Sequence, residues 1–330
     1  MKKQVKILMA LLMVILMINL VGCAKTEEVK KEDTTKVEEK IVEKVEKAEK
    51  VEVKAVETSY PITITDLNGN EIVLKEEPKK IVSLGPNVTE IIYAIGKGDN
   101  LIARTDYCNY PEEVLSLPSI GTLRDINIES VAALEPDLII GSTHFTDENK
   151  QKLEELGIPV AVIYAPESFD GVYDMITKTG EMLNANEEAK KVVKGMQETV
   201  EIVKNAVKDE AKPTVYYVVA FGEHGDYTAT GETFIGAMLT MAGGENVAKD
   251  TEGWAYSLEK LVEKDPEIIM ASKYYDTKKA FMEHENYKQL TAVKEGKVYE
   301  IDNNKIDRQG PRVSEGLLEM AKILHPNSFK

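Results

Sequence analysis

The four arginines are the residues of this sequence whose chemistry stands out most. The chain has 330 residues with 41 Lys and Arg, and only Arg104, Arg124, Arg308 and Arg312 are Arg. All four fall in predicted loops. The planar guanidinium fork binds carboxylates and similar oxyanions bidentately, which the point charge of a lysine does not. We therefore interpret these positions as sites for an oxygen-rich ligand or for a fixed structural pair, and we leave both alternatives open for Arg104 and Arg312.

Aromatic side chains gather in loops that follow predicted strands. Trp254, the only Trp of the chain, lies in a Gly-rich loop. Large aromatic rings form much of the apolar wall of ligand pockets. We therefore predict that Trp254 forms part of a ligand wall, whereas Phe234 and Phe281 fill the cores of their domains.

The sequence lacks the motifs of catalysis. It has no Gly-rich nucleotide loop after its first strand, no Gly-x-Ser-x-Gly and no His-Glu-x-x-His. Cys23 and Cys108 are too few for an iron–sulfur cluster, and the four histidines are too scattered for a site that holds a free metal ion. The net charge of −16 argues against nucleic acid. We expect a binding protein without a cofactor or a protein-held metal, and not an enzyme.

The N-terminus has the pattern of an export signal. Three lysines precede a run of twelve apolar residues at 7–18, which is shorter than the roughly 18 to 20 residues that span a bilayer. Leu20-Val21-Gly22-Cys23 then resembles the lipobox of bacterial lipoproteins, in which the cysteine is acylated. We predict a signal peptide at 1–22, lipidation at Cys23 and a solvated Lys/Glu-rich tether at 23–57.

The rest of the chain alternates buried strands with helices. Unalternated apolar runs at 80–85, 137–141 and 159–163 are typical of parallel strands, and helical periods lie between them. Residues 129–142 match residues 259–272 at an offset of 130. The fold class is therefore α/β with two similar lobes, 58–185 and 212–330, each a parallel sheet with helices on both faces.

One long helix is predicted to join the lobes. Residues 186–211 form the connection, with Asn186 as the expected cap and apolar residues at spacings of three and four as far as Val207. The segment lacks the Gly and Ser residues of a flexible linker. We therefore expect a rigid strut that lets the lobes move only slightly.

These motifs, in this order, resemble a known family. They are Ile81-Val-Ser-Leu-Gly-Pro-Asn-Val-Thr-Glu90, Thr105 to Pro111, Ile128 to Ile140, and Arg308-Gln-Gly-Pro-Arg312, and the resemblance spans about residues 60–328. The chain resembles the helical-backbone metal-chelate receptors, which are class III periplasmic-binding-protein-like lipoproteins of ABC importers. Members bind iron–siderophores, haem or cobalamin.

The resemblance implies a binding site between the lobes and a docking surface on top of them. Glu129 and Glu259, one from each copy of the repeat, match the acidic residues that dock on arginine pockets of the permease. Arg124 and Arg308 lie in loops that face the cleft in the family. The ligand-binding residues expected on this basis are Asn87, Tyr107, Tyr110, Arg124, His144, Phe221, His224, Trp254, Tyr274 and Arg308.

The resemblance also implies the partners and the location. They are a metal chelate, the ABC permease and ATPase subunits, and the bacterial cell membrane, to which the lipid anchor holds the protein on its extracytoplasmic side. We favour an anionic ferric siderophore because it suits an arginine pair, with cobalamin as the next candidate. Haem is the alternative of the same class, with His144, His224 or Tyr274 as axial candidates. A free metal-ion receptor and a metalloenzyme on this fold are the remaining alternatives.

Overall fold

The computed structural model describes residues 57–142, 144–223 and 225–329. The predicted signal peptide, the predicted lipidation site Cys23, nearly all of the tether and the predicted ligand residue His224 lie outside the described residues. None of the helices in the described part of the chain is long and apolar enough to cross a membrane.

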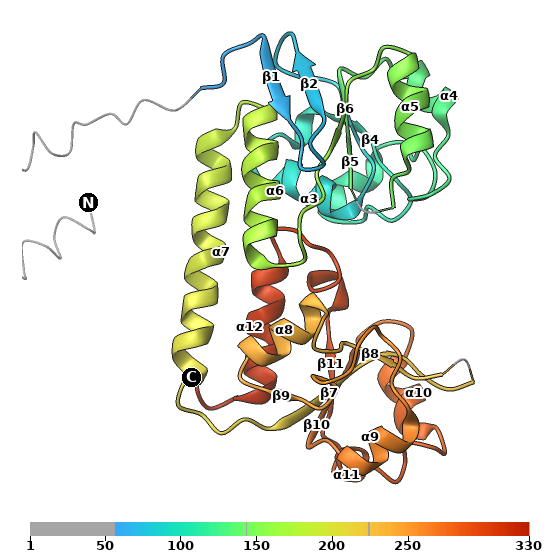
Figure 1. Cartoon of the computed structure of the whole chain (residues 1–330), viewed down its shortest axis with the longest axis vertical. Coiled ribbons are helices and arrows are strands. Elements are labelled where there is room, and N and C mark those ends of the chain that lie inside the picture. The colour runs from blue at the N-terminus through green and yellow to red at the C-terminus, as the bar shows by residue number, and fades with distance from the viewer. Residues whose placement is uncertain (1–56, 143, 224, 330) are drawn as a thin grey trace, which may run out of the picture. The chain divides into compact units, whose positions relative to one another are not determined.

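The first lobe is built on a parallel four-stranded sheet in the order β4-β3-β5-β6 (Figure 1). Its residues are buried along β3, β5 and β6, as expected for a sheet covered on both faces. An antiparallel hairpin, β1-β2, precedes this sheet. The elements are β1 (Ile62–Thr65), β2 (Glu71–Leu74), β3 (Ile81–Ser83), α3 (Pro86–Ala94), β4 (Leu101–Ala103), α4 (Ile128–Ala133), β5 (Leu138–Gly141), α5 (Asp147–Glu155), β6 (Val160–Val162) and α6 (Phe169–Met182), with short 3-10 helices at Gly98–Asn100 and Glu112–Ser116.

The second lobe has a sheet in the order β11-β10-β7-β8, with β9 also paired to β7. Strands β9, β10 and β11 are parallel to their neighbours, as predicted. Strand β8 runs antiparallel to β7, which departs from the predicted parallel sheet. The elements are β7 (Thr214–Ala220), β8 (Tyr227–Thr228), α8 (Phe234–Met241), β9 (Glu245–Asn246), α9 (Leu258–Lys264), β10 (Ile268–Ser272), α10 (Thr277–Glu283), α11 (Thr291–Lys294), β11 (Val298–Ile301) and α12 (Val313–Leu324), with a 3-10 helix at Asn303–Lys305.

The sequence repeat corresponds to equivalent structure in the two lobes. Each copy of the repeat contains a proline, Pro136 or Pro266. The residues before them, Glu135 and Asp265, both adopt left-handed backbone conformations, with φ of 48° and 38°. The acidic residue after each proline then fastens the neighbouring strand. The Asp137 carboxylate accepts from the backbone N–H of Lys80 at 2.9 Å, and Glu267 accepts from that of Thr214 at 3.1 Å. The repeat therefore encodes the same helix–strand junction twice.

The long helix α7 (Asn186–Val207) lies between the two sheets in the sequence. Met196, Val200, Val203 and Val207 are buried on one stripe, as predicted. The predicted cap is wrong: the helix begins at Asn186 itself, without a side-chain cap, and the Asn186 amide donates to Thr58 Oγ1 at 3.0 Å.

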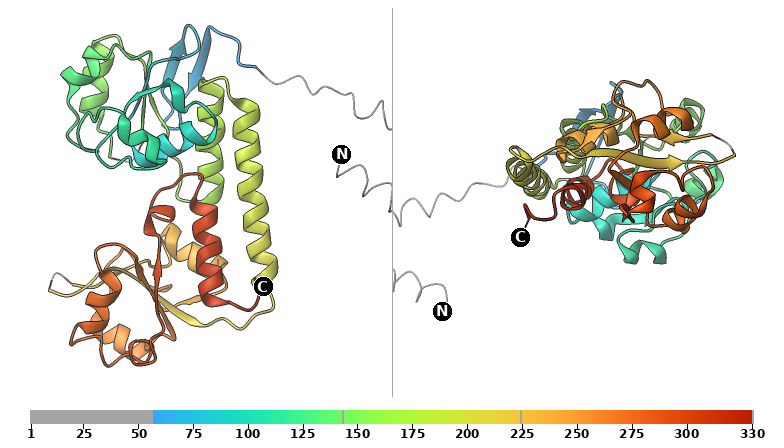
Figure 2. Two further views of the ribbon diagram at one scale, coloured as in Figure 1. Left: turned by 180° about the vertical axis from the view of Figure 1, so that it is seen from behind. Right: turned by 90° about the horizontal axis from the view of Figure 1, so that it is seen from below.

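One apolar core continues through both lobes along α7. Helix α6 of the first lobe and helix α12 of the second pack against it (Figures 1 and 2). The rings of Phe169 on α6 and Phe234 on α8 meet edge to face, with centroids 5.3 Å apart. Because close-packed side chains resist sliding, this shared core holds the lobes in one relative orientation.

Candidate functional site

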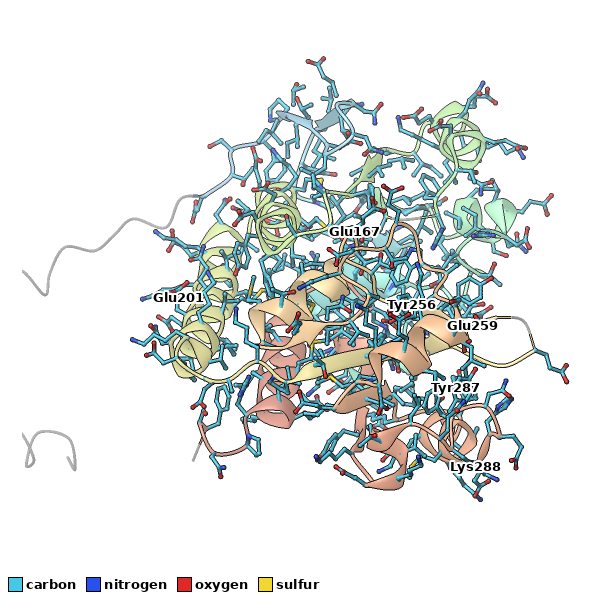
Figure 3. The ribbon with its side chains drawn as sticks, turned by 60° about the horizontal axis from the view of Figure 1, so that its bottom comes forward. Glu167, Glu201, Tyr256, Glu259, Tyr287 and Lys288 are labelled. Carbon is cyan, nitrogen blue, oxygen red and sulfur yellow. The ribbon has the colours of Figure 1, made fainter. Side chains whose placement is uncertain are left out.

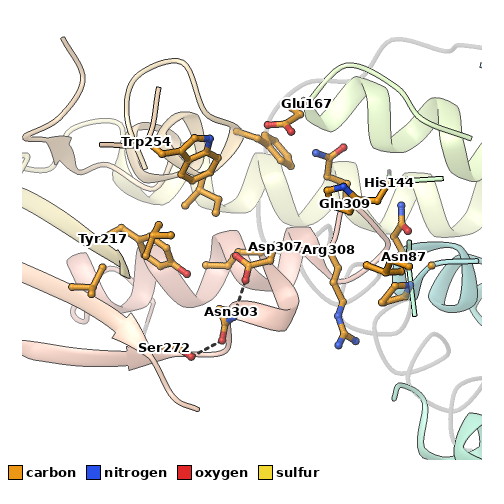
Figure 4. A pocket seen from close by; sticks show the side chains of 18 residues that line it. Asn87, His144, Glu167, Tyr217, Trp254, Ser272, Asn303, Asp307, Arg308 and Gln309 are labelled. Carbon is orange, nitrogen blue, oxygen red and sulfur yellow. Dashed lines mark hydrogen bonds between the residues drawn. The ribbon is translucent and has the colours of Figure 1, made fainter. Parts of the chain in front are cut away.

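A cavity of about 540 Å³ opens between loops of the two lobes, within the range of small-molecule sites. It lies beyond the carboxyl ends of β3, β5, β6, β7, β10 and β11, where ligands of open parallel sheets bind (Figure 4). Its lining residues are Gly85, Pro86, Asn87, Leu123, His144, Glu167, Tyr217, Val218, Val219, Phe234, Ile235, Trp254, Ser272, Asn303, Ile306, Asp307, Arg308 and Gln309.

Four of the predicted ligand residues line this cavity: Asn87, His144, Trp254 and Arg308. Asn87 is in the first turn of α3 and its amide donates to Ser142 Oγ at 2.8 Å. His144 is exposed and has a left-handed backbone conformation, with φ of 72°. The cavity thus receives a fixed amide and an accessible imidazole from the first lobe.

Trp254 is held at the cavity by the backbone of its loop. The Trp254 carbonyl accepts from Thr228 N at 2.8 Å, and Gly253 N donates to the Glu232 carboxylate at 3.0 Å. The indole remains 42% exposed while the main chain beneath it is fixed. Trp254 therefore presents a rigid aromatic surface to the cavity.

The other predicted ligand residues lie elsewhere. Arg124 and Tyr107 are exposed and do not line the cavity, although Leu123 does. Tyr110 and Tyr274 line a separate groove beside Asp302, whose carboxylate accepts from the Tyr274 hydroxyl at 3.0 Å.

Phe221 is placed in an aromatic cluster of the second lobe. Its ring packs edge to face against Phe281 and Tyr287, with centroids 5.2 and 5.6 Å away. It is not among the residues that line the cavity. Sequence alone did not separate Phe221 from Trp254, because both lie in loops that follow strands, whereas Phe281 fills the core as predicted.

Several polar lining residues were not singled out from the sequence. Tyr217 is the most hidden of them, because it sits within the apolar strand β7. Among the described residues no group bonds to its hydroxyl, which points toward the cavity in Figure 4, and burial raises its pKa well above the ordinary value. The signal that could have revealed it is the pair Tyr216 and Tyr217, because adjacent residues of a strand point to opposite faces of the sheet. The other polar lining residues that sequence reasoning missed are Glu167, Ser272, Asn303, Asp307 and Gln309.

Three of these residues form a hydrogen-bonded chain on the floor of the cavity. Ser272 Oγ donates to Asn303 Oδ1 at 2.6 Å, and Asn303 Nδ2 donates to Asp307 Oδ2 at 2.7 Å (Figure 4). The Asp307 carboxylate faces the cavity, yet protein surrounds it within the cleft, and the resulting loss of hydration raises its pKa. The hydrogen bond from Asn303 lowers the pKa of Asp307 and orients its carboxylate.

The Arg308 side chain leaves the cavity that its residue lines. Its Nη1 donates to Glu90 Oε1 at 2.9 Å, and Nη2 contacts the Tyr107 carbonyl at 3.4 Å. In Figure 4 it extends away from Trp254 and Tyr217. The same Glu90 carboxylate accepts from Arg312 Nε at 2.8 Å and from Arg312 Nη2 at 2.6 Å. A buried carboxylate of the first lobe therefore binds two guanidinium groups of the second.

The two other arginines differ in their surroundings. Arg104 donates to the backbone carbonyls of Val114 and Thr105, at 3.2 and 3.0 Å, which is a local structural role. Among the described residues, the Arg124 guanidinium has no hydrogen-bond or ion-pair partner. The acidic residues that line the cavity are Asp307 and Glu167, and the guanidinium of the lining residue Arg308 is paired with Glu90.

This fold and site have counterparts among known proteins. Residues 81–305 match the Periplasmic binding protein family. An uncharacterized ABC transporter substrate-binding lipoprotein of Bacillus subtilis (strain 168) is 33% identical over 279 residues, which is 82% of this chain and 88% of that protein. The chain belongs to the periplasmic binding protein family.

Further relatives support the same placement. A cobalamin-binding protein of Halobacterium salinarum (strain ATCC 29341 / DSM 671 / R1) is 28% identical over 280 residues, 81% of this chain and 75% of that protein. The apo periplasmic heme-binding protein RhuT of Roseiflexus sp. RS-1 has a TM-score of 0.69 at 21% identity, covering 76% of this chain and 99% of that one. This likeness shows a shared fold. The predicted family is confirmed, and the chain is a substrate-binding protein of the ABC transporter class and not an enzyme.

The two predicted docking glutamates occupy equivalent places in this periplasmic binding protein. Glu129 is the second residue of α4. Glu259 is the second residue of α9 (Figure 3). Each helix is capped by the side chain of the preceding residue, Asn127 or Ser257. Both glutamates are exposed, and within the described part of the chain neither has an ion-pair partner.

No group of three or more His, Cys, Asp or Glu side chains among the described residues could hold a metal ion. His144 is the only histidine among the described residues that lines the cavity. A chelate that brings its own complete set of ligands needs at most one such contact from the protein.

Proposed function

We propose that this protein is the lipid-anchored, extracytoplasmic receptor of an ABC importer and that it captures a metal chelate between its lobes. The observation that carries this is the cavity at the carboxyl ends of both sheets, in a chain of the periplasmic binding protein family. Cys23 carries the lipid, 23–57 is the tether, and the lobes 58–185 and 212–330 are joined by 186–211. The permease and its ATPase are the partners.

The charges of the cavity favour a chelate without net negative charge. Asp307 and Glu167 line it, while the Arg308 guanidinium is bound to Glu90 and Arg124 lies outside. Carboxylates accept hydrogen bonds from amide and ammonium groups and repel anions. The arginine pair on which the preference for an anionic ferric siderophore rested does not face the ligand space.

We therefore place a corrinoid first among the candidate ligands and an uncharged ferric hydroxamate second. A corrinoid carries many peripheral amides, which suit Asp307, Glu167 and the free Tyr217 hydroxyl, and its ring gives Trp254 a broad apolar partner. The relatives at 28% and 26% identity are a cobalamin-binding and a vitamin B12-binding protein, which supports this order. His144 is the side chain available to contact the metal.

Fluorescence titration tests the ligand class. Trp254 is the only tryptophan, so emission of the purified mature lipoprotein reports on the cleft alone. We expect cyanocobalamin to quench it saturably, a ferric trishydroxamate to bind more weakly, and a ferric triscatecholate, which is anionic, to bind least. Saturable binding of the triscatecholate alone would overturn the proposed order. Flat titrations with all three would contradict a chelate receptor of this kind.

Uptake tests the docking role of the two glutamates. We expect the double variant Glu129→Ala and Glu259→Ala to bind ligand as the wild type does and to lose transport, because complementary charges register two partners. Glu188→Ala removes an exposed first-turn carboxylate from α7 and is the matched control, with transport retained. Loss of ligand binding in the double variant would place these residues in the ligand site instead.

A further inference from the structure

We propose that Glu90 determines the charge selectivity of the cavity by holding the Arg308 guanidinium outside it. Glu90 is a positioning residue, since it lines a different groove and does not touch the ligand space. The inference rests on the proposed function and refines it.

Glu90 is placed to act on two cations at once. It lies on α3 and its side chain is only 2% exposed. Its Oε1 accepts from both Arg308 and Arg312, and its Oε2 accepts from Arg312. The side chains of Arg308 and Arg312 are largely buried, at 13% and 11% exposure, so bulk water solvates neither cation fully. Glu90 is therefore the carboxylate that hydrogen-bonds both cations, while Asp307 and Asp302 interact electrostatically with Arg308 and Arg312.

The two arginines are held unequally. Arg312 makes a two-pronged contact with Glu90, and its guanidinium carbon lies 3.9 Å from the centroid of the Tyr110 ring. Arg308 has one bond to Glu90 and one long contact to a backbone carbonyl. Cation–π stacking and bidentate pairing both favour retention of Arg312. Arg308 is accordingly the cation that Glu90 loses first.

Release of Arg308 would change the cavity. Arg308 already lines the cavity beside Asp307, so rotation of its side chain away from Glu90 brings the guanidinium toward the ligand. A glutamine at position 90 has one acceptor oxygen, and its amide nitrogen is a donor that faces other donors. It carries no charge to offset the two cations, and its nitrogen cannot accept from Arg312 Nε. The more weakly held Arg308 would then be released, and the cavity would gain a free cation that binds propionates and other carboxylates.

The test compares an anionic probe with an uncharged one. Haemin carries two propionates and cyanocobalamin has no net charge, so the ratio of their dissociation constants reports charge selectivity. We expect Glu90→Gln to shift this ratio toward haemin by about tenfold, the effect of one charge-assisted hydrogen bond. In the double variant Glu90→Gln and Arg308→Gln the ratio should return to the wild-type value. Glu315→Gln removes a carboxylate from the same groove without freeing a guanidinium and should leave the ratio unchanged.

Crystal structures of the wild type and Glu90→Gln give a readout that needs no ligand. The guanidinium of Arg308 should lie on Glu90 in the first and in the cavity in the second. If the wild type binds neither probe, the proposed ligand class fails. The location of the Arg308 guanidinium in the two structures still tests the role of Glu90. If Glu90→Gln does not fold, Glu90→Asp keeps the charge but shortens the reach, and the ratio should shift in the same direction by about threefold. Arg308 staying at residue 90, or a shift that persists in the double variant, would overturn the inference.

Discussion

The two lobes share one plan but divide the work unequally. The strand orders β4-β3-β5-β6 and β9-β7-β10-β11 are equivalent, and so are the capped helices α4 and α9. The second lobe adds the antiparallel strand β8 and the Trp254 loop bonded to it. Most of the cavity lining comes from this lobe. Duplication thus supplies the frame, and the second lobe adds a strand and a loop that brings Trp254 to the cavity.

The segments that lead into α6 and α12 show the same inequality. In the first lobe, residues 163–168 pass directly from β6 into α6, and Ser168 caps the helix by accepting from Gly171 N at 3.0 Å. In the second, residues 302–312 are longer and carry Asp307, Arg308 and Arg312. This longer segment reaches across to Glu90 of the first lobe. Contact between the lobes is therefore made largely by the second lobe.

The largest effect is expected from cutting the apolar contact between the lobes. Phe169→Ala removes the ring that meets Phe234 and should cost about 3–5 kcal/mol of unfolding free energy. Phe281→Ala, inside the second lobe, is the matched control with a similar cost. We expect calorimetry to resolve two transitions only for Phe169→Ala, because only that variant uncouples the lobes. A single transition in both variants would mean that the remaining contacts, α7 and the Glu90 ion pairs among them, suffice to couple the lobes.

A smaller effect, on ligand affinity, is expected from truncating a side chain on either wall of the cavity. Trp254→Ala should weaken ligand binding by about thirtyfold, as truncation of a central aromatic contact typically does. Leu123→Ala, on the opposite wall, should weaken it by about fivefold. Calorimetric titration measures both, since the first variant lacks the fluorescent reporter. Equal losses would contradict a ligand wall built mainly by the second lobe.

The smallest effect concerns an ionic contact of the first lobe. Hydrogen bonds from Lys79 and then Lys97 lower the pKa of Glu77 from 4.5 to about 2. Because the folded pKa is depressed, the carboxylate stabilises the fold above about pH 4.5, and this stability is lost as the pH falls toward 2. Glu77→Gln should therefore cost about 1 kcal/mol at pH 7 and nothing at pH 2, measured by denaturant unfolding. Glu71→Gln, on β2, controls for the loss of one carboxylate, and a pH-independent difference for Glu77→Gln would refute this origin.

Local patterns made much of the fold predictable. The buried runs at 137–141 and 159–163 became β5 and β6 because an apolar run without alternation suits a strand covered on both faces. The repeat at an offset of 130 located the matched glutamates, since capping and helix starts depend on near neighbours. Asn186 was predicted to cap α7 but is its first residue. Its amide bonds to Thr58, which is far away in the sequence.

The site was predictable only in part. Loops after strands identified Asn87, His144 and Trp254, because the carboxyl ends of parallel strands meet at one edge. They also suggested Phe221, whose ring packs against Phe281, and Tyr274, whose hydroxyl donates to Asp302. Neither partner is adjacent in the sequence.

Sequence by itself determined the family, the duplicated α/β lobes and the stiff connection, because periodicity, capping and motif order are properties of neighbouring residues. Tertiary structure decided which arginines face a ligand. Arg308 and Glu90 are 218 residues apart in the sequence, and their bond places the guanidinium away from the cavity. The four arginines looked alike as loop residues, but the charge of a site depends on which partners the fold brings to each one.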